Sequence, residues 1–368
     1  MSKLTPELGT KHWSRLYGPS LGSAQIKTHL HDFIVEEELG FEPSGAGEHI
    51  FLWVEKSNLN TAYVAEELAK FSALPLRAIT YAGRKDKYAL TRQWFGVHIA
   101  NNKEPDWSNF HLDGARIVKL TRNDRKLRVG VLKANRFELT LRNVSLNKGL
   151  TEQDLLERLN RIKLEGAPNY YGSQRFGEMR VSVTNDNGQQ TEQQMRLGGN
   201  LSLAQKMIAG EAIRNRNKRS LAISAIRSWL FNEVIHQRIQ QQQFNLVQLG
   251  DAMQLSGSNS FFIFNDPKEL ENIQQRLSCN DINITAPLVG DGQLHTSNEA
   301  KTLETNVLKE HTQLAQALNK LGLKQERRAI RVMPTEFEWH FSNTELTLSF
   351  TLPSGCFATS IVRELFDV

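Results

Sequence analysis

Metal-binding and disulfide patterns are missing from this sequence. Its 368 residues include two cysteines, Cys279 and Cys356, and contain neither a CxxC pair nor a Cys/His cluster. Structural zinc sites and disulfide frameworks both need several suitably spaced ligands or cysteines, so neither is expected here. The sparse use of cysteine fits a protein of the reducing cytosol.

Long apolar runs and nucleotide-binding fingerprints are missing as well. Residues 1–5 (MSKLT) have no apolar signal core, and no run approaches the roughly 20 residues that cross a bilayer. Neither GxxxxGK(S/T) nor a GxGxxG between a strand and a helix is present. We therefore expect a soluble cytoplasmic protein that lacks the common nucleotide-binding loops.

Charged residues are abundant, with a small excess of cations. Lys and Arg number 45 against 40 Asp and Glu, a formal net charge of +5, and 39% of the residues are hydrophobic. A chain of this length and apolar content is sufficient for about two domains. The weak positive charge permits a nucleic-acid partner without requiring one.

Strands and helices are predicted at both ends of the chain. Residues 50–54 read as a strand buried on both faces, and residues 61–71 as a helix that Thr61 could cap. Apolar and polar residues alternate over 136–142, which predicts a half-buried strand, and over 337–352, which predicts an antiparallel hairpin. The two ends therefore share one α+β pattern.

The middle of the chain differs in composition. Residues 163–325 are rich in Gln, Asn and Gly, and they include an amphipathic helix at 220–242 that follows a basic run at 214–219. We interpret this stretch as a domain inserted into a split domain that is formed by residues 1–162 and 326–368. Insertions of this kind are tolerated where the ends of the insert lie close together.

The most informative segment is residues 81–93 (YAGRKDKYALTRQ). It places one carboxylate, Asp86, among four cations: Arg84, Lys85, Lys87 and Arg92. Neighbouring cations favour the ionised carboxylate and can hold phosphates, which suits nucleophilic chemistry on a nucleotide. The alternative is a solvated loop with surface ion pairs, and composition alone favours that alternative by roughly two to one.

Several other segments allow two interpretations. Residues 168–177 (PNYYGSQRFG) could stack on unpaired bases or form a rigid junction packed with aromatic rings. Thr359 or Ser360 could cap a helix whose free N–H groups hold an anion, although an ordinary capped helix is the simpler interpretation. Cations interleave with apolar residues over 116–122 and 125–128, which predicts strands whose basic face is either solvated or phosphate-binding.

Two further features favour a structural role on pattern alone. Alternation makes Phe137 a core residue, by roughly four to one over a platform for base stacking. An acidic patch without a metal-ligand pattern is expected to be a solvated face; it contains His31, Asp32, Glu36, Glu37 and Glu38.

Taken together, these stretches resemble the TruD family of tRNA pseudouridine synthases. The matching pieces occur in family order from about residue 27 to the end: Lys27, 32–37, 40–43, 47–50, 82–89, 133–137, 168–177, 216–220 and 357–365. The resemblance implies an α+β fold of the pseudouridine-synthase type, with a mixed, mainly antiparallel sheet and flanking helices. It also implies an inserted α/β TRUD domain at residues 163–325, between the two parts of the catalytic domain.

The resemblance also assigns roles to individual residues. Asp86 matches the family's nucleophile, which attacks the nucleotide either at the ribose C1′ or at the uracil ring. Five residues match positions that contact the substrate or the nucleophile: Lys27, Phe33, Asn135, Phe137 and Phe357. In this view Phe137 stacks on the extruded base, against the core role that alternation favours. Lys85, Lys87 and Tyr88 are assigned only to general attraction of phosphates.

The implied activity is that of an isomerase, a tRNA pseudouridine(13) synthase that converts uridine-13 in the D arm. The family uses neither cofactor nor metal, and the implied partner is tRNA, with no membrane and no protein partner, on a monomer. The alternative is a non-catalytic RNA-binding protein on the same fold, which need not keep a carboxylate at position 86. A methyltransferase or nuclease would need a methyl-donor pocket or metal carboxylates, and neither pattern is visible.

Overall fold

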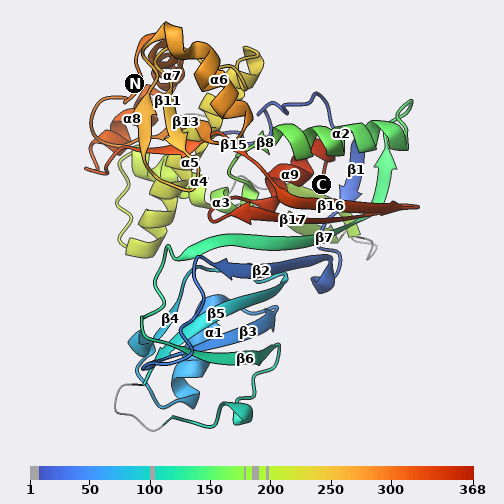
Figure 1. Cartoon of the computed structure of the whole chain (residues 1–368), viewed down its shortest axis with the longest axis vertical. Coiled ribbons are helices and arrows are strands. Elements are labelled where there is room, and N and C mark those ends of the chain that lie inside the picture. The colour runs from blue at the N-terminus through green and yellow to red at the C-terminus, as the bar shows by residue number, and fades with distance from the viewer. Residues whose placement is uncertain (1–7, 100–103, 178–179, 185–189, 196–198) are drawn as a thin grey trace. The chain divides into compact units, whose positions relative to one another are not determined.

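The computed structural model describes residues 8–99, 104–177, 180–184, 190–195 and 199–368, so that residues 1–5 lie outside it. The chain forms two compact units, each assembled from separate segments of the sequence (Figure 1). The large-sheet unit comprises Ser20–Leu164, Met333–Ala358 and Leu365–Val368, and the helical unit comprises Met1–Pro19, Glu165–Val332 and Thr359–Glu364. A split domain with an insertion at 163–325 remains our proposal for the domain organisation.

A nine-stranded sheet is the framework of the large-sheet unit. Its strands are β1 (Gly22–Gln25), β2 (Phe33–Leu39), β3 (His49–Ser57), β4 (Ile79–Tyr81), β5 (Leu90–His98), β6 (Ala115–Asn123), β7 (Leu132–Leu146), β16 (Thr335–Ser342) and β17 (Glu345–Pro353). The order is β16-β17-β7-β2-β5-β3-β6, with β1 on β7 and β4 on β5. β2 and β5 are parallel and the other pairs are antiparallel, which confirms the expected mixed, mainly antiparallel sheet.

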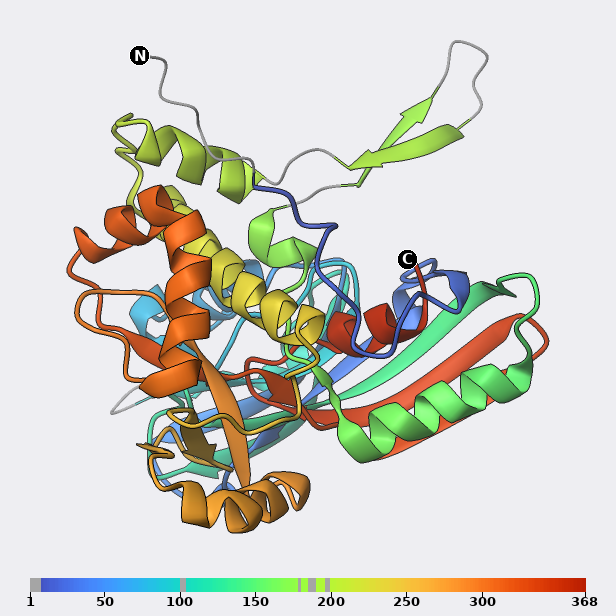
Figure 2. The ribbon, with the colours of Figure 1, turned by 90° about the horizontal axis from the view of Figure 1, so that it is seen from above.

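Two helices and three short 3-10 helices accompany this sheet: α1 (Thr61–Phe71), α2 (Glu152–Glu165), η1 (Leu30–Asp32), η2 (Leu76–Ala78) and η3 (Trp107–Asn109). Alternate residues of β3, among them Leu52, pack in a core with α1, whereas Phe51 packs on the other face of the sheet with Trp94 and Leu127. The strand is therefore buried on both faces, as predicted. α2 lies along the end of the sheet that contains β16 and β17, in the views of Figures 1 and 2.

The helical unit is built around the long helix α5 (Arg216–Gln240) and a four-stranded antiparallel sheet. The sheet has the order β12 (Phe261–Ile263), β11 (Ala252–Leu255), β13 (Ile282–Leu288) and β14 (Glu326–Ala329). The other helices are α3 (Ser173–Phe176), α4 (Gly199–Ile208), η4 (Pro267–Glu269), α6 (Leu270–Ser278), α7 (Asn298–Glu310), α8 (Thr312–Asn319) and α9 (Ala358–Leu365). Two short pairs are β9 (Arg180–Thr184) with β10 (Gln190–Met195), and β8 (Ala167–Pro168) with β15 (Arg331–Val332).

A buried ion pair fixes the C-terminal end of α5. The two terminal guanidinium nitrogens of Arg238 donate to the carboxylate of Asp251, at 2.8 and 3.0 Å, and each side chain is 1% exposed. Removing one partner of such a pair leaves an uncompensated buried charge, so the pair ties the C-terminal end of α5 to the residue that precedes β11. The structure confirms a long helix here, although it begins before the predicted residue 220 and includes part of the basic run.

Three sequence predictions about local structure are wrong. Asn60, not Thr61, is at the N-cap position of α1. Thr359 and Ser360, the predicted caps, both lie inside α9, and the Ser360 hydroxyl donates to the Tyr170 carbonyl oxygen at 2.9 Å. β6 ends at Asn123, so residues 125–128 are not a strand. Within the described ranges, no helix is both long enough and apolar enough to cross a membrane.

Candidate active site

Asp86 lies in the loop that connects β4 to β5, and Lys27 is its ion-pair partner. Lys27 Nζ is 2.9 Å from Asp86 Oδ2, with the two side chains 29% and 24% exposed. The same ammonium lies 4.1 Å from the centroid of the Phe33 ring, at a distance typical of a cation–π contact. The lysine backbone has a φ of 59°, a left-handed conformation that is uncommon for residues other than glycine. The structure therefore brings a carboxylate, an ammonium and an aromatic ring together.

Buried polar side chains hold the backbone of the Asp86 loop. The ammonium of Lys56, which is 1% exposed, donates to the carbonyl oxygens of Asp86 and Leu59 at 2.9 and 3.0 Å. Thr61 Oγ1 accepts from the backbone N–H of Lys85 at 3.0 Å and donates to Gln93 Oε1 at 2.8 Å. The loop is thus fixed from β3, α1 and β5, so Asp86 has a defined position before any substrate binds.

Burial also changes the ionisation of Lys56. Its loss of hydration lowers the pKa of the Lys56 ammonium from 10.5 to about 8, although the nearby carboxylate of Asp86 acts in the opposite direction. The positive charge of Lys85 lowers this pKa further. Burying the Lys56 ammonium next to the Lys85 ammonium is unfavourable. The carbonyl oxygens of Asp86 and Leu59 and the Asp86 carboxylate must therefore offset much of that penalty.

Lys85 is also buried, which contradicts its expected role in attracting phosphates. Its side chain is 8% exposed, and its Nζ lies 2.8 Å from Oε1 of the fully buried Glu37 carboxylate. The ammonium also donates to Asn135 Oδ1 at 2.7 Å. Burial raises the pKa of Glu37, while Lys85 and the Trp94 N–H, 3.1 Å from its other oxygen, act to lower it.

The acidic patch is accordingly not a uniformly solvated face. Glu37 is buried as described, and Asp32 is 2% exposed and accepts several hydrogen bonds from the guanidinium of Arg142. Arg92, counted among the cations near Asp86, instead pairs with Glu36 and Glu55. Of the four cations expected around Asp86, two are therefore used in other ion pairs.

Aromatic rings lie next to this ion-pair cluster. Phe33 and Phe137 meet edge to face with centroids 6.3 Å apart, and Phe137 packs on Phe350 at 5.6 Å. Phe33 is 4% exposed and Phe137 7% exposed, so the burial of Phe137 predicted by alternation is confirmed. Contacts thus run from Asp86 through Lys27 and Phe33 to Phe137.

Phe357 is half-buried in the segment between β17 and α9. β17 ends at Pro353, which pairs with Ala134 of β7, and the preceding Leu352 pairs with Asn135. The register therefore places the start of the Phe357 segment beside the strand that carries Asn135 and Phe137.

The aromatic residues at 168–177 are mostly inside the helical unit. Tyr170 and Tyr171 are 3% and 7% exposed, and Phe176 is fully buried. The guanidinium of Arg328 lies 4.4 Å from the centroid of the Tyr171 ring. This burial favours the packed alternative over a platform for unpaired bases.

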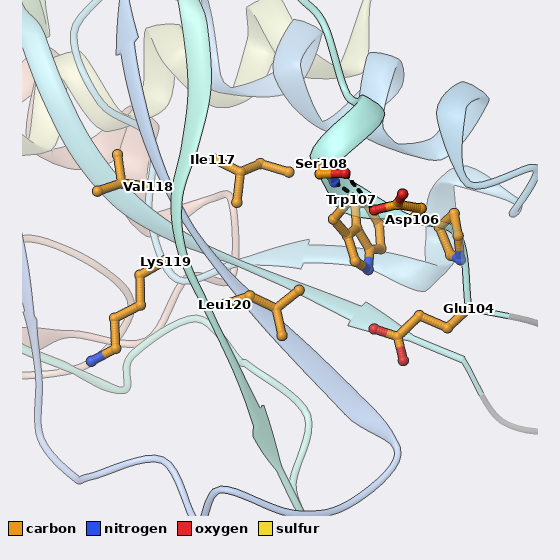
Figure 3. A pocket seen from close by; sticks show the side chains of 9 residues that line it. Glu104, Asp106, Trp107, Ser108, Ile117, Val118, Lys119 and Leu120 are labelled. Carbon is orange, nitrogen blue, oxygen red and sulfur yellow. Dashed lines mark hydrogen bonds between the residues drawn. The ribbon is translucent and has the colours of Figure 1, made fainter.

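A surface hollow of about 420 Å³ lies elsewhere, between η3 and β6 (Figure 3). Trp107, Ile117 and Leu120 supply apolar walls, and Glu104 and Lys119 add charged groups to its lining. None of its lining residues is an expected site residue. In the described part of the chain, no group of three or more His, Cys, Asp or Glu residues could hold a metal ion.

Sequence reasoning missed four residues that shape the site: Glu37, Lys56, Thr61 and Gln93. Gln93 is fully buried and Thr61 is 2% exposed, although both types usually lie at the surface. One signal was available, because Gln93 directly precedes an apolar strand segment (WFGV) and Lys56 comes two residues after the end of another (IFLWV). A polar residue inside a buried strand needs a partner, and here the partner is the Asp86 loop.

Comparisons with known proteins agree on one family. The family model described as tRNA pseudouridine synthase D (TruD) matches residues 19–188 and 204–365. The chain is 46% identical to tRNA pseudouridine synthase D of Pseudoalteromonas atlantica, over 97% of this chain and 96% of that one. It is 42% identical to the protein of the same name from Aeromonas salmonicida, over 96% and 94%.

A solved structure shares the fold. The crystal structure of the putative tRNA pseudouridine synthase D (TruD) from Methanosarcina mazei superposes with a TM-score of 0.68 at 21% identity. The match covers 95% of this chain and 94% of that one. At this level of identity the likeness confirms the fold class expected from the sequence.

Proposed function

The chain belongs to the tRNA pseudouridine synthase D (TruD) family, and on that premise we propose that it converts a uridine in the D arm of tRNA, uridine-13, to pseudouridine. Asp86 is the nucleophile in this proposal. The observation that carries it is the contact set around that carboxylate, with Lys27 Nζ 2.9 Å from Oδ2 and 4.1 Å from the Phe33 ring.

The reaction is an isomerisation, which needs no co-substrate. The carboxylate of Asp86 attacks either the ribose C1′ or the uracil ring, and the bond from C1′ to N1 breaks. The uracil turns, C5 bonds to C1′, and the bond to the Asp86 oxygen breaks, which restores the free carboxylate. The proton leaves C5 while N1 gains one. An ionised carboxylate is required for the attack, and the ammonium of Lys27 favours that form.

The target base must leave its stack before a side chain can reach it. Phe33 and Phe137 are the aromatic residues nearest to the Lys27–Asp86 pair in the chain of contacts described above. A base held against an aromatic ring gains about 1–3 kcal/mol. Asn135 and Phe357 complete the proposed contacts with the nucleotide.

Affinity for tRNA needs cations that are free to meet phosphates. Four exposed cations lie at the start of α5: Arg214 just before its N-cap, and Arg216, Lys218 and Arg219 in its first turn. None of them forms an ion pair with a described residue. The first turn contains no acidic residue, although cations at a helix N-terminus oppose the helix dipole. A bound phosphate backbone would remove that repulsion, so we assign this turn to tRNA.

The direct test maps pseudouridine in tRNA from cells with and without the protein. We expect pseudouridine at position 13 only when the protein is present. The Asp86→Asn variant should bind tRNA about as tightly as wild type, because its ammonium neighbours and shape remain, but should form no product. Turnover by this variant would remove Asp86 from the role of nucleophile, and an unchanged tRNA map would refute the activity itself.

A further inference from the structure

The candidate site contains a buried ammonium that the proposed reaction does not use. Lys85 Nζ lies 2.7 Å from Asn135 Oδ1 and 2.8 Å from Glu37 Oε1. Its side chain is 8% exposed, which leaves little of it for phosphates or solvent. A charged group held this way must act through the two side chains that it contacts.

The contact with Lys85 fixes the orientation of the Asn135 amide. A lysine ammonium has donors and no acceptor, so the amide atom that faces it must be the oxygen. Within the described part of the chain, Asn135 Nδ2 donates to no protein acceptor. Asn135 is 8% exposed on β7, where β2 and β17 pair with it on either side. The amide therefore has its acceptor occupied and its two N–H donors available.

We propose that Lys85 is a positioning residue that holds the Asn135 amide so that it offers the uracil hydrogen-bond donors only. This inference rests on the proposed function. Uracil has two carbonyl oxygens, O2 and O4, and one of them accepts from Asn135 Nδ2. Without Lys85 the amide could rotate by half a turn and present its oxygen to those carbonyls, which would be repulsive.

Glu37 allows the Lys85 ammonium to be buried beside Asn135. Its carboxylate is fully buried, balances the charge of Lys85 and accepts from the Trp94 N–H with its other oxygen. Glu37 also pairs with Asn135 across β2 and β7, so the ion pair and the amide share one position in the sheet. The amide is thereby oriented by rigid strands and not by a mobile loop.

A double-mutant cycle tests whether Lys85 acts through Asn135. Lys85→Met should lower the single-turnover rate about tenfold in the wild-type background and have little further effect in the Asn135→Ala background. An equal reduction in both backgrounds would show a merely structural role and overturn the inference. Because Lys85→Met leaves a buried carboxylate unpaired, the cycle is repeated with Lys85→Met combined with Glu37→Gln, which removes both charges of this pair.

Two further measurements do not depend on how the lysine variants fold. Asn135→Asp keeps an acceptor for Lys85 but replaces the N–H donors with an oxygen. Its single-turnover rate should therefore be no higher than that of Asn135→Ala. A wild-type rate would overturn the inference. Substrates with 2-thiouridine or 4-thiouridine at the target carry a weaker acceptor. One of them should slow the wild type several-fold and leave Asn135→Ala unaffected. Wild type that makes no pseudouridine would instead refute the proposed function.

Discussion

Lys56 should make the stability of the protein depend on pH in the alkaline range. Burial lowers the pKa of its ammonium from 10.5 to about 8, and the side chain is 1% exposed, so bulk solvent screens the charge little. In the unfolded chain the amine has its ordinary pKa of 10.5. Between pH 8 and pH 10.5 the unfolded state therefore binds more protons than the folded state. The free energy of unfolding therefore rises with pH, and this contribution is lost as the pH falls through 8.

The two pKa values of Lys56 set the size of the effect. Between pH 7 and pH 9.5 they give a rise of about 2 kcal/mol in the free energy of unfolding from this one group. Lys56→Met removes the titrating group, so the variant should lack that rise. The measurement is urea unfolding of both proteins across this range, followed by the intrinsic fluorescence of tryptophan.

The control for this experiment is Lys133→Met, because the Lys133 side chain is 67% exposed. That variant should follow the wild-type pH dependence. If the curves of Lys56→Met and wild type run parallel from pH 7 to pH 9.5, the ammonium of Lys56 does not have a depressed pKa. The inference that burial penalises this charge would then be wrong.

Three other variants test the site and the tRNA surface. Lys27→Met should lower turnover by about tenfold to a hundredfold, because it removes the charge paired with the nucleophile. The free energy of unfolding of this variant should change by at most about 1 kcal/mol, since the ion pair is partly exposed. Phe137→Leu should keep most of the core volume and fold, yet lose activity in a turnover assay; full activity would exclude a stacking role. Replacing Arg216 and Lys218 by Gln should weaken tRNA binding. It should also reduce the slope of log Kd against log salt by about 0.7–0.9 for each phosphate that the variant no longer neutralises. The control Lys301→Gln, at an exposed position on α7, should change neither the affinity nor the slope.

Periodicity predicted the elements of the fold well where one face of an element is buried. The helix at 61–71 has the predicted bounds, and the alternating residues of 136–142 and 337–352 lie in paired antiparallel strands. Errors occurred where hydrogen bonds decide the outcome, as at 125–128 (RKLR), where basic residues flank one apolar residue but form no strand. Alternation describes burial and does not specify which backbone groups find partners.

The candidate site was predictable only in part. The family resemblance singled out Lys27 and Asp86, which the structure brings into contact. Neither pattern nor resemblance indicated that the side chains of Lys56, Glu37 and, in the loop itself, Lys85 are buried. Charged residues in a sequence are assigned to the surface by default, because burial requires a partner, and that partner can come from a distant strand.

Those buried charges explain why a short loop can hold a nucleophile in one place. The loop between β4 and β5 would be free to move if only solvent met its polar groups. Here the Lys56 ammonium donates to the Asp86 carbonyl oxygen, and the Thr61 hydroxyl accepts from the backbone N–H of Lys85. Lys56 and Thr61 both belong to rigid elements, β3 and α1. Each of these contacts is a hydrogen bond inside the protein, where a hydrogen bond is stronger than in water and an unpaired polar group is costly. The position of the carboxylate is therefore determined by the sheet and α1, and a substitution beneath the loop should affect the reaction as much as one beside the substrate.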